Sequence, residues 1–219
     1  MTAKLQIRTL VSMPFEENTY VVWQPGSTEC VVIDPGLQPE LIEDCLREEG
    51  LTVRAILNTH GHPDHIAGNE RMKQLAPDAP LLIGAGDARM LSDPEANMSA
   101  ALGFAVISPP ADRTVNEGDI IEAAGLSFRV LDIPGHSPGH VVFVHEGMPM
   151  LVFGGDVLFR GSIGRYDFPS GNGPLLLEGI RRKLFTLLED TVVYPGHGPV
   201  TTVGHEMRTN PFLSVGEGR

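Results

Sequence analysis

The chain has 219 residues and a mass of 23.6 kDa, the size of one ordinary domain with enough material for a sizeable core. Hydrophobic residues make up 42% of it and the mean hydropathy is close to zero, which is typical of a globular protein. The net charge of −12 and the lack of a long Lys/Arg run argue against nucleic acid as a partner, because phosphate contacts need a basic surface.

Residues 1–10 show no export signal, and the two cysteines show no disulfide framework. Residues 1–10 contain Lys4 and Arg8 and no apolar run, so we expect no secretory signal and a cytoplasmic location. No stretch reaches the ~20 apolar residues of a membrane helix, and no membrane partner is expected. Cys30 lies in an apolar strand and Cys45 on the apolar face of a helix, so both are expected to be buried packing residues.

The first half of the chain predicts strands that lead into helices. The expected elements are strands near 5–11, 19–24, 29–34 and 54–58, helices over 39–49 and from about 64 to 76, and a helical but irregular stretch over 84–104. Pro39 opens the first helix and Gly50 follows its end, Pro77 stops the second helix, and Pro94 starts a second piece of the irregular stretch.

The second half repeats this mixture. The expected elements are strands around 119–133, 141–145, 150–154 and 191–194, a helix that opens at Pro174, and a C-terminal helix near 200–208. The helix after Pro174 has one apolar stripe, formed by Leu176, Leu177, Ile180, Leu184, Leu187 and Leu188. Apolar strands with helices in both halves predict a single α/β domain over residues 1–219, built from two sheets flanked by helices.

The segment 59–65, Thr-His-Gly-His-Pro-Asp-His, holds four potential metal ligands within six residues. His60 and His62 are two apart on an extended stretch, so their side chains can enter one site. Asp64 and His65 follow Pro63, which favours the first turn of a helix, and they therefore point at a neighbouring position. Imidazoles together with a carboxylate suit zinc, iron or manganese, and the segment predicts a metal site.

Three further candidate ligands follow the same pattern, in which an apolar strand stops at glycine or proline and a ligand-type residue comes next. They are His136 after Pro134-Gly135, Asp156 after Gly154-Gly155, and His197 after Pro195-Gly196. Taken singly, each fits an ordinary turn or a packed histidine equally well. Beside the 59–65 segment, all three are expected to be ligands, because strand ends converge on one edge of a layered sheet fold.

The order His-x-His-x-Asp-His, then His136, Asp156 and His197, resembles the metallo-β-lactamase superfamily over nearly the whole chain. The stretches 135–140 (Gly-His-Ser-Pro-Gly-His) and 164–168 (Gly-Arg-Tyr-Asp-Phe) look like its glyoxalase II and persulfide dioxygenase branch, and the tail from Gly198 to Leu213 is similar to short bacterial glyoxalase II-like hydrolases. The resemblance implies a four-layer αββα sandwich without the C-terminal helical glutathione-binding domain of full-length glyoxalase II.

The resemblance also implies two divalent metal ions, zinc first and iron or manganese as alternatives. His60, His62 and His136 would hold one ion, Asp64, His65 and His197 the other, and Asp156 would bridge them. Asp64 is expected to be needed for catalysis. Asp34 and His140 are expected beside the ligands, where an acidic group can orient a ligand imidazole. Arg165 and Tyr166 are the expected substrate-binding residues.

The expected reaction is hydrolysis of a small-molecule thioester, S-D-lactoylglutathione or a related acyl-thiol. A thiolate leaves without a proton donor, whereas a lactam nitrogen needs one. The zinc β-lactamases usually carry a cysteine ligand at the position of Asp156, which argues against a β-lactamase. Two alternatives remain open: a persulfide dioxygenase with one iron, and a non-catalytic metal-binding module, which would need only four ligands. The sequence gives no indication of the oligomeric state.

Overall fold

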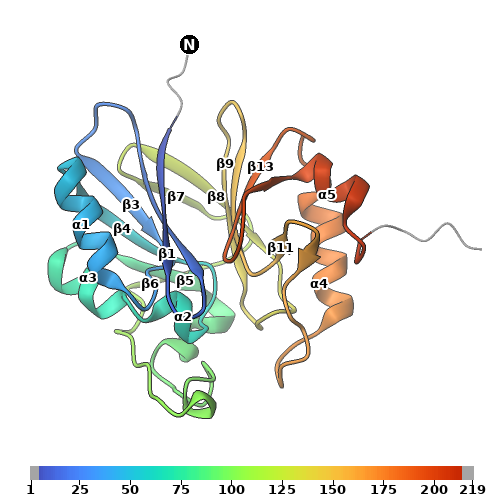
Figure 1. The fold of residues 1–219 in the computed structure, drawn as a ribbon, viewed down its shortest axis with the longest axis horizontal. Coiled ribbons are helices and arrows are strands. Elements are labelled where there is room, and N and C mark those ends of the chain that lie inside the picture. Colours follow the sequence, from blue (N-terminus) through green and yellow to red (C-terminus); the bar gives the residue numbers. More distant parts are fainter. Residues whose placement is uncertain (1–4, 214–219) are drawn as a thin grey trace, which may run out of the picture.

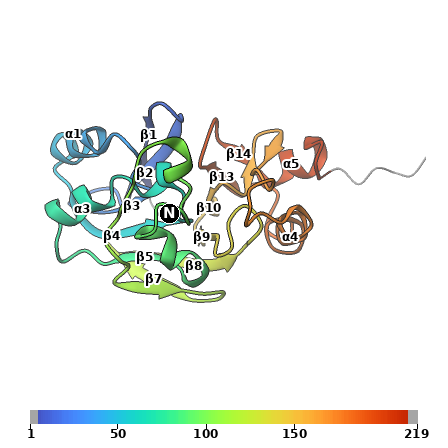
Figure 2. The ribbon, with the colours of Figure 1, turned by 90° about the horizontal axis from the view of Figure 1, so that it is seen from below.

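The chain folds into four layers, in which two β-sheets face each other and helices cover their outer faces (Figure 1). The computed structural model describes residues 5–213. One outer layer contains α1 (Pro39–Glu49) and α3 (Asn69–Leu75), and the other contains α4 (Gly173–Gly179) and α5 (Val203–Thr209). Figure 2 shows the same layers from below. The predicted α/β class and the four-layer αββα sandwich are confirmed.

The first sheet has the strand order β1-β2-β3-β4-β5-β6, in which β3 to β6 run parallel. Its strands are β1 (Gln6–Ser12), β2 (Glu17–Trp23), β3 (Glu29–Ile33), β4 (Thr52–Asn58), β5 (Leu81–Gly84) and β6 (Arg113–Val115). The second sheet has the order β14-β13-β10-β9-β8-β7, and only β10 and β13 pair in parallel. Its strands are β7 (Ile120–Ala123), β8 (Leu126–Asp132), β9 (Val141–His145), β10 (Leu151–Gly155), β13 (Val192–Pro195) and β14 (Thr201–Thr202).

Three apolar clusters fill the three spaces between the layers, and β3 shows how one strand serves two of them. Val31 and Ile33 pack between the sheets, while Cys30 and Val32 pack under α1 and α3. Successive strand side chains point to opposite faces, so an uninterrupted apolar run is what a strand covered on both sides requires. Cys30 and Cys45 are buried and free, as expected.

The helix expected from 64 to 76 is two helices, α2 (Pro63–Ile66) and α3. The break lies at Gly68, whose backbone N–H donates to the carbonyl of Pro35 at 2.8 Å. A side chain at Gly68 would meet the carbonyl oxygens of Pro35 and Gly36, so only glycine lets the helix approach the loop after β3 this closely. This contact is long-range and has no local sequence signal.

The stretch 84–104 contains two 3₁₀ segments, Ala85–Leu91 and Ala100–Leu102, so the helical piece expected at Pro94 is wrong. The Asn97 side chain donates to the carbonyls of Met90 and Val106, and these bonds replace those of a regular helix. Strands β5 and β6 on either side of the stretch were not expected.

Three other boundaries differ from the prediction. The strand expected over 119–133 is the hairpin β7–β8, whose turn residues Ala124 and Gly125 both have positive φ, as a two-residue hairpin turn requires. The helix after Pro174 continues from α4 as a π-turn over Ile180–Leu184, and Leu188 is 65% exposed and outside the apolar stripe. The C-terminal helix starts at Val203, because the Thr202 side chain accepts from the N–H of His205 as its N-cap.

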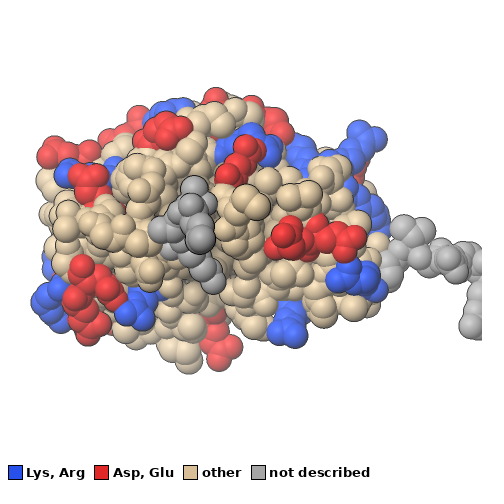
Figure 3. Space-filling model, turned by 90° about the horizontal axis from the view of Figure 1, so that it is seen from above, with Lys and Arg blue, Asp and Glu red and all other residues tan. Residues whose placement is uncertain are grey.

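The surface matches the acidic composition. On the face that Figure 3 shows, Lys and Arg side chains lie among Asp and Glu side chains and do not merge into one basic surface. Within residues 5–213, no helix has the length and apolar character needed to cross a bilayer.

Candidate metal centre

Loops that follow four strands carry the seven predicted ligands to one place between the two sheets. His60, His62, Asp64 and His65 follow β4, His136 follows β8, Asp156 follows β10, and His197 follows β13. Backbone hydrogen bonds join the sheets here, from Val141 to Thr59 at 2.8 Å and from Asn18 to Gly196 at 2.7 Å. These bonds therefore fix the ligand loops of one sheet relative to those of the other.

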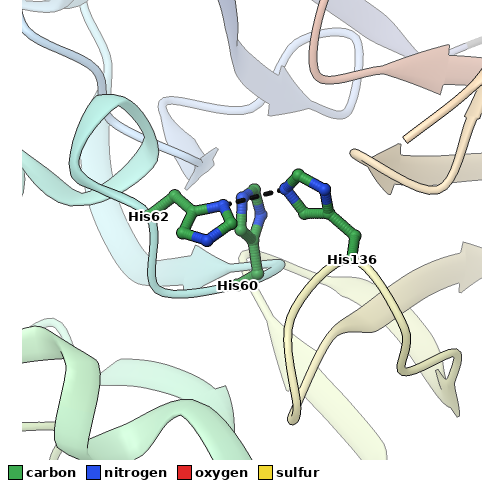
Figure 4. A group of neighbouring side chains, drawn as sticks. All are labelled: His60, His62 and His136. Carbon is green, nitrogen blue, oxygen red and sulfur yellow. Dashed lines mark hydrogen bonds between the residues drawn. The ribbon is translucent and has the colours of Figure 1, made fainter. Parts of the chain in front are cut away.

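The first group consists of His60, His62 and His136, whose ligand nitrogens lie within 4.8 Å of one another (Figure 4). His62 Nδ1 and His136 Nε2 are 2.8 Å apart. Burial and, after it, the neighbouring histidines lower the pKa of His60 well below its usual value and that of His62 to about 3. Both rings are therefore neutral at physiological pH, the form that binds a metal ion.

The second group consists of Asp64, His65 and His197. Asp64 Oδ2 lies 3.3 Å from His197 Nε2 and 3.7 Å from His65 Nε2. Burial alone would lower the pKa of both histidines, but the carboxylates around them raise it. Burial would likewise raise the pKa of Asp64, yet His65 and His197 bring it below its ordinary value, so this carboxylate is ionised.

Asp156 lies between the two groups. Its Oδ1 is 3.5 Å from His65 Nε2, and its Oδ2 is 3.4 Å from His136 Nε2 and 3.6 Å from His197 Nε2. One carboxylate thus faces a histidine of the first group and two of the second, which is the position a shared ligand needs.

Contacts at Nδ1 orient four histidine rings so that Nε2 faces the other candidate ligands. His136 Nδ1 donates to the carbonyl of Arg165 at 2.8 Å, and His197 Nδ1 donates to that of Phe15 at 3.0 Å. A carbonyl only accepts, so in the neutral rings Nδ1 carries the hydrogen and Nε2 can bind a cation. His65 Nδ1 lies 3.1 Å from Asp34 Oδ2, and His60 Nδ1 lies 3.1 Å from the Thr59 hydroxyl, which itself donates to Asp34.

Asp34 and His140 lie beside the ligands, where they were expected. Asp34, at a φ of 50°, accepts from the N–H and the hydroxyl of Thr59, both at 2.7 Å, and faces His65. Asp34, His60 and His65 also have ligand atoms within 4.8 Å of one another, but Thr59 and His65 occupy both oxygens of Asp34, so we assign it to orienting His65. The His140 ring stacks on His60 at 4.7 Å, and its Nε2 accepts from the N–H of Asp156 at 3.0 Å.

The donor set fits divalent metal ions. Among the described residues, His60 Nε2, His65 Nε2 and Asp156 Oδ1 are buried polar atoms without a hydrogen-bond partner, as is His62 Nε2. Leaving a buried polar atom unpaired costs about 1–3 kcal/mol, so several at one place call for a cation. Nitrogen and carboxylate donors together suit zinc, iron and manganese, and the arrangement does not select one of them.

Asp87 is a residue of this centre that the sequence analysis missed. Its buried carboxylate accepts from the N–H of Gly61 at 3.1 Å, the hydroxyl of Ser137 at 2.5 Å and the N–H of Gly139 at 2.6 Å. It thus ties the loop of His60 and His62 to the loop of His136. The sequence does contain a signal for Asp87. The apolar run Leu81-Leu82-Ile83 is followed by glycines and then by Asp87, which is the pattern that predicted Asp156 as a ligand.

A cavity of about 350 Å³ opens onto both ligand groups. Arg165 lines it, lies 4.4 Å over the ring of Phe168 and pairs with Asp167 at 3.0 Å. Tyr166 is not among the lining residues; it is 44% exposed and its ring lies against Gly173. Of the two expected substrate-binding residues, the structure thus brings only Arg165 to the cavity.

Comparison with known proteins agrees with this geometry. A family model described as the metallo-beta-lactamase superfamily matches residues 13–197. Hydroxyacylglutathione hydrolase GloC of Haemophilus influenzae is 35% identical over 213 residues, which are 96% of this chain and 99% of that protein.

Two solved structures combine similar folds with similar sequences. BLEG-1, described as a B3 metallo-beta-lactamase, is 36% identical with a TM-score of 0.91 over 96% of this chain and all of that one. TTHA1623 in a di-iron-bound form is 40% identical with a TM-score of 0.82 over 94% of this chain and all of that one.

Proposed function

This chain belongs to the metallo-β-lactamase superfamily, and we propose that it is a metal-dependent thioester hydrolase of the glyoxalase II type with two divalent ions. The position of Asp156 between the two ligand groups is the observation that carries the proposal. His60, His62 and His136 would hold one ion, Asp64, His65 and His197 the other, and Asp156 both. Ions held in this way supply Lewis acidity and lower the pKa of water to about 7.

The residues of the centre preserve the geometry that such a reaction needs. Asp34 holds His65 in the orientation that turns Nε2 inward, and His140 holds the backbone of Asp156. Asp87 keeps the two loops of the first group together. Groups fixed before substrate arrives need no reorganisation during the reaction.

The residues that line the cavity favour a thioester over an amide as the substrate, because an amide nitrogen needs a proton as it leaves. Among the described residues, the lining of the cavity apart from the candidate ligands is Phe15, Pro63, Met98, Ala101, Leu102, Phe159, Arg165 and Phe168. None of these carries a carboxyl, hydroxyl, ammonium or imidazole group, and an arginine does not give up its proton. A thiolate, with an ordinary pKa near 8.5, leaves without a donor, so water adds to the acyl carbon and the products are a carboxylic acid and a thiol.

The test compares substrates on one preparation. Protein loaded separately with zinc, iron or manganese should release free thiol from S-D-lactoylglutathione, and Asp156→Asn should lose most of this activity together with one metal ion per chain. A chromogenic cephalosporin serves as the β-lactam control. Hydrolysis of the cephalosporin without release of thiol from any thioester would replace the proposal with a β-lactamase.

A second candidate is a persulfide dioxygenase, supported by the Gly-Arg-x-Asp-Phe loop that brings Arg165 and Phe168 to the cavity. It predicts one iron per chain and oxygen uptake with glutathione persulfide. Uptake of this kind, without thioester hydrolysis, would decide for the dioxygenase.

A further inference from the structure

The wall of the cavity that faces the candidate ligands is apolar and comes from four separate segments. Phe15 belongs to the turn between β1 and β2, Met98 and Leu102 to the stretch between β5 and β6, Phe159 to β11 (Leu158–Phe159), and Phe168 to the Arg165 loop. Phe15 is 37% exposed and Leu102 is 51% exposed, so both present apolar surface at the mouth of the cavity. Apart from the candidate ligands, Arg165 is the one polar residue of the described lining, and apolar side chains gathered in this way are typical of a site for an apolar ligand group.

The charges of the cavity do not favour a thiol that carries carboxylates. Arg165 is the sole Lys or Arg among the described lining residues, and its guanidinium makes two hydrogen bonds to Asp167, at 3.0 and 3.1 Å. The carboxylates of the lining, Asp64 and Asp156, are candidate ligands whose charge bound metal ions would offset, so they do not decide how the thiol is recognised. Asp167 already balances the charge of Arg165, and the glutathione moiety of a thioester has two carboxylates, each of which normally pairs with an arginine or lysine of its own.

Resting on the proposed thioester hydrolysis, we infer that the substrate carries an apolar acyl group, which the wall of Phe15, Met98, Leu102, Phe159 and Phe168 binds, and that the carboxylates of its thiol are not recognised. At about 350 Å³ the cavity lies within the range of small-molecule sites. A lactoyl group has three carbons and a hydroxyl, and it would leave most of this wall in water.

The test separates the acyl group from the thiol. Acetyl, butanoyl and hexanoyl thioesters of N-acetylcysteamine, a neutral thiol, are compared with S-hexanoylglutathione and S-D-lactoylglutathione. We expect kcat/KM to rise about threefold per added methylene, and so by about eightyfold over the four methylenes from acetyl to hexanoyl, because each methylene buried contributes about 0.8 kcal/mol. We expect the two hexanoyl thioesters to differ by no more than about threefold.

Two leucine-sized residues of one segment provide matched variants. Leu102→Ser should lower the ratio of hexanoyl to acetyl kcat/KM by about threefold to tenfold. Ile107→Ser should leave that ratio unchanged, because Ile107 is 62% exposed and is not among the lining residues.

The outcomes distinguish this inference from the function on which it rests. Hydrolysis that does not depend on acyl length, or a clear preference for S-D-lactoylglutathione, would refute the inference that the substrate carries an apolar acyl group. The proposed thioester hydrolysis would be unaffected. Failure of all five thioesters would overturn both.

Discussion

Asp87 Oδ1 accepts a 2.6 Å hydrogen bond from the backbone N–H of Gly139, a residue of the loop that also carries His136. Its other oxygen accepts from Gly61, between His60 and His62. A carboxylate that touches no candidate ligand therefore sets the distance between the two loops of the first group, in the way that residues around a metal site commonly orient its ligands.

The Asp87→Asn variant tests this role. The amide keeps the size of the side chain but replaces one accepting oxygen with a donor, so a bond to one loop is lost. We expect metal affinity of the first group to fall about tenfold to a hundredfold, measured by competition with a chelator. Asp93→Asn is the control, since Asp93 caps a turn in the same segment and its side chain bonds, among the described residues, only to Arg89, Glu95 and Ala96. Equal metal affinity in Asp87→Asn and wild type would remove Asp87 from the centre.

Asp64→Asn should reduce activity and leave the fold intact. The Asp64 side chain is 15% exposed, and it faces His65 and His197 without bonding to the backbone of another element. Loss of its charge weakens the second group directly, so turnover should fall by about a hundredfold or more. The metal-free variant should still fold, with a lower unfolding free energy, because the Asp64 carboxylate is paired with His65 and His197. A folded variant with two ions per chain and wild-type turnover would contradict this assignment.

The two ligand groups should release metal at different pH values. The carboxylates raise the pKa of His65 and His197, so on acidification protons compete with metal at the second group first. Burial keeps the pKa of His62 at about 3 and that of His60 well below its ordinary value, so these two ligands of the first group stay unprotonated to much lower pH. Equilibrium dialysis from about pH 8 down to about pH 5 should show one ion lost before the other. His197→Ala should lack the earlier step, and simultaneous release of both ions from wild type would refute the order.

The same depressed pKa predicts acid instability of the metal-free chain. The unfolded state takes up a proton at His62 near pH 6.5, whereas the folded state resists it down to about pH 3. The contribution of His62 to the unfolding free energy is therefore complete above about pH 6.5 and is lost as the pH falls towards 3. Replacement with His62→Gln should flatten the fall of stability in this window, as measured by urea denaturation. If the unfolding free energy of the variant falls with pH as steeply as that of the wild type, His62 is not the source of the acid instability.

Two adjacent glycines of β10 provide a test of packing beside the centre. Gly155 has a φ of 46°, and a side chain there would collide with Thr59, which holds Asp34. Gly155→Ala should therefore lower the unfolding free energy by about 2 kcal/mol or more and weaken metal binding. A side chain at Gly154 would make only an ordinary 3.5 Å contact with Val193, so Gly154→Ala is the matched control. Similar stability of the two variants would show that the loop adjusts to the added methyl group.

The sequence alone predicted the seven candidate ligands and the layers of the fold. Strands such as β3 are apolar on both faces because helices and a second sheet cover them, and this pattern is local. The seven candidate ligands stand next to glycine or proline at strand ends, or follow Pro63 in the 59–65 segment, and this pattern is local as well. The αββα order came from the resemblance that these residues carry.

Only the tertiary structure decided which distant residues meet. The helix break at Gly68 depends on Pro35, the clamp at Asp87 depends on Gly139, and the apolar wall depends on Phe15 and Phe168 lining the same cavity. Such contacts are set by strand order and sheet packing, so no periodicity within a short window of sequence encodes them. Arg165 and Asp167 are close in the sequence, but their spacing does not show that the two side chains pair. This pairing depends on the side-chain conformations at the cavity, which only the tertiary structure fixes.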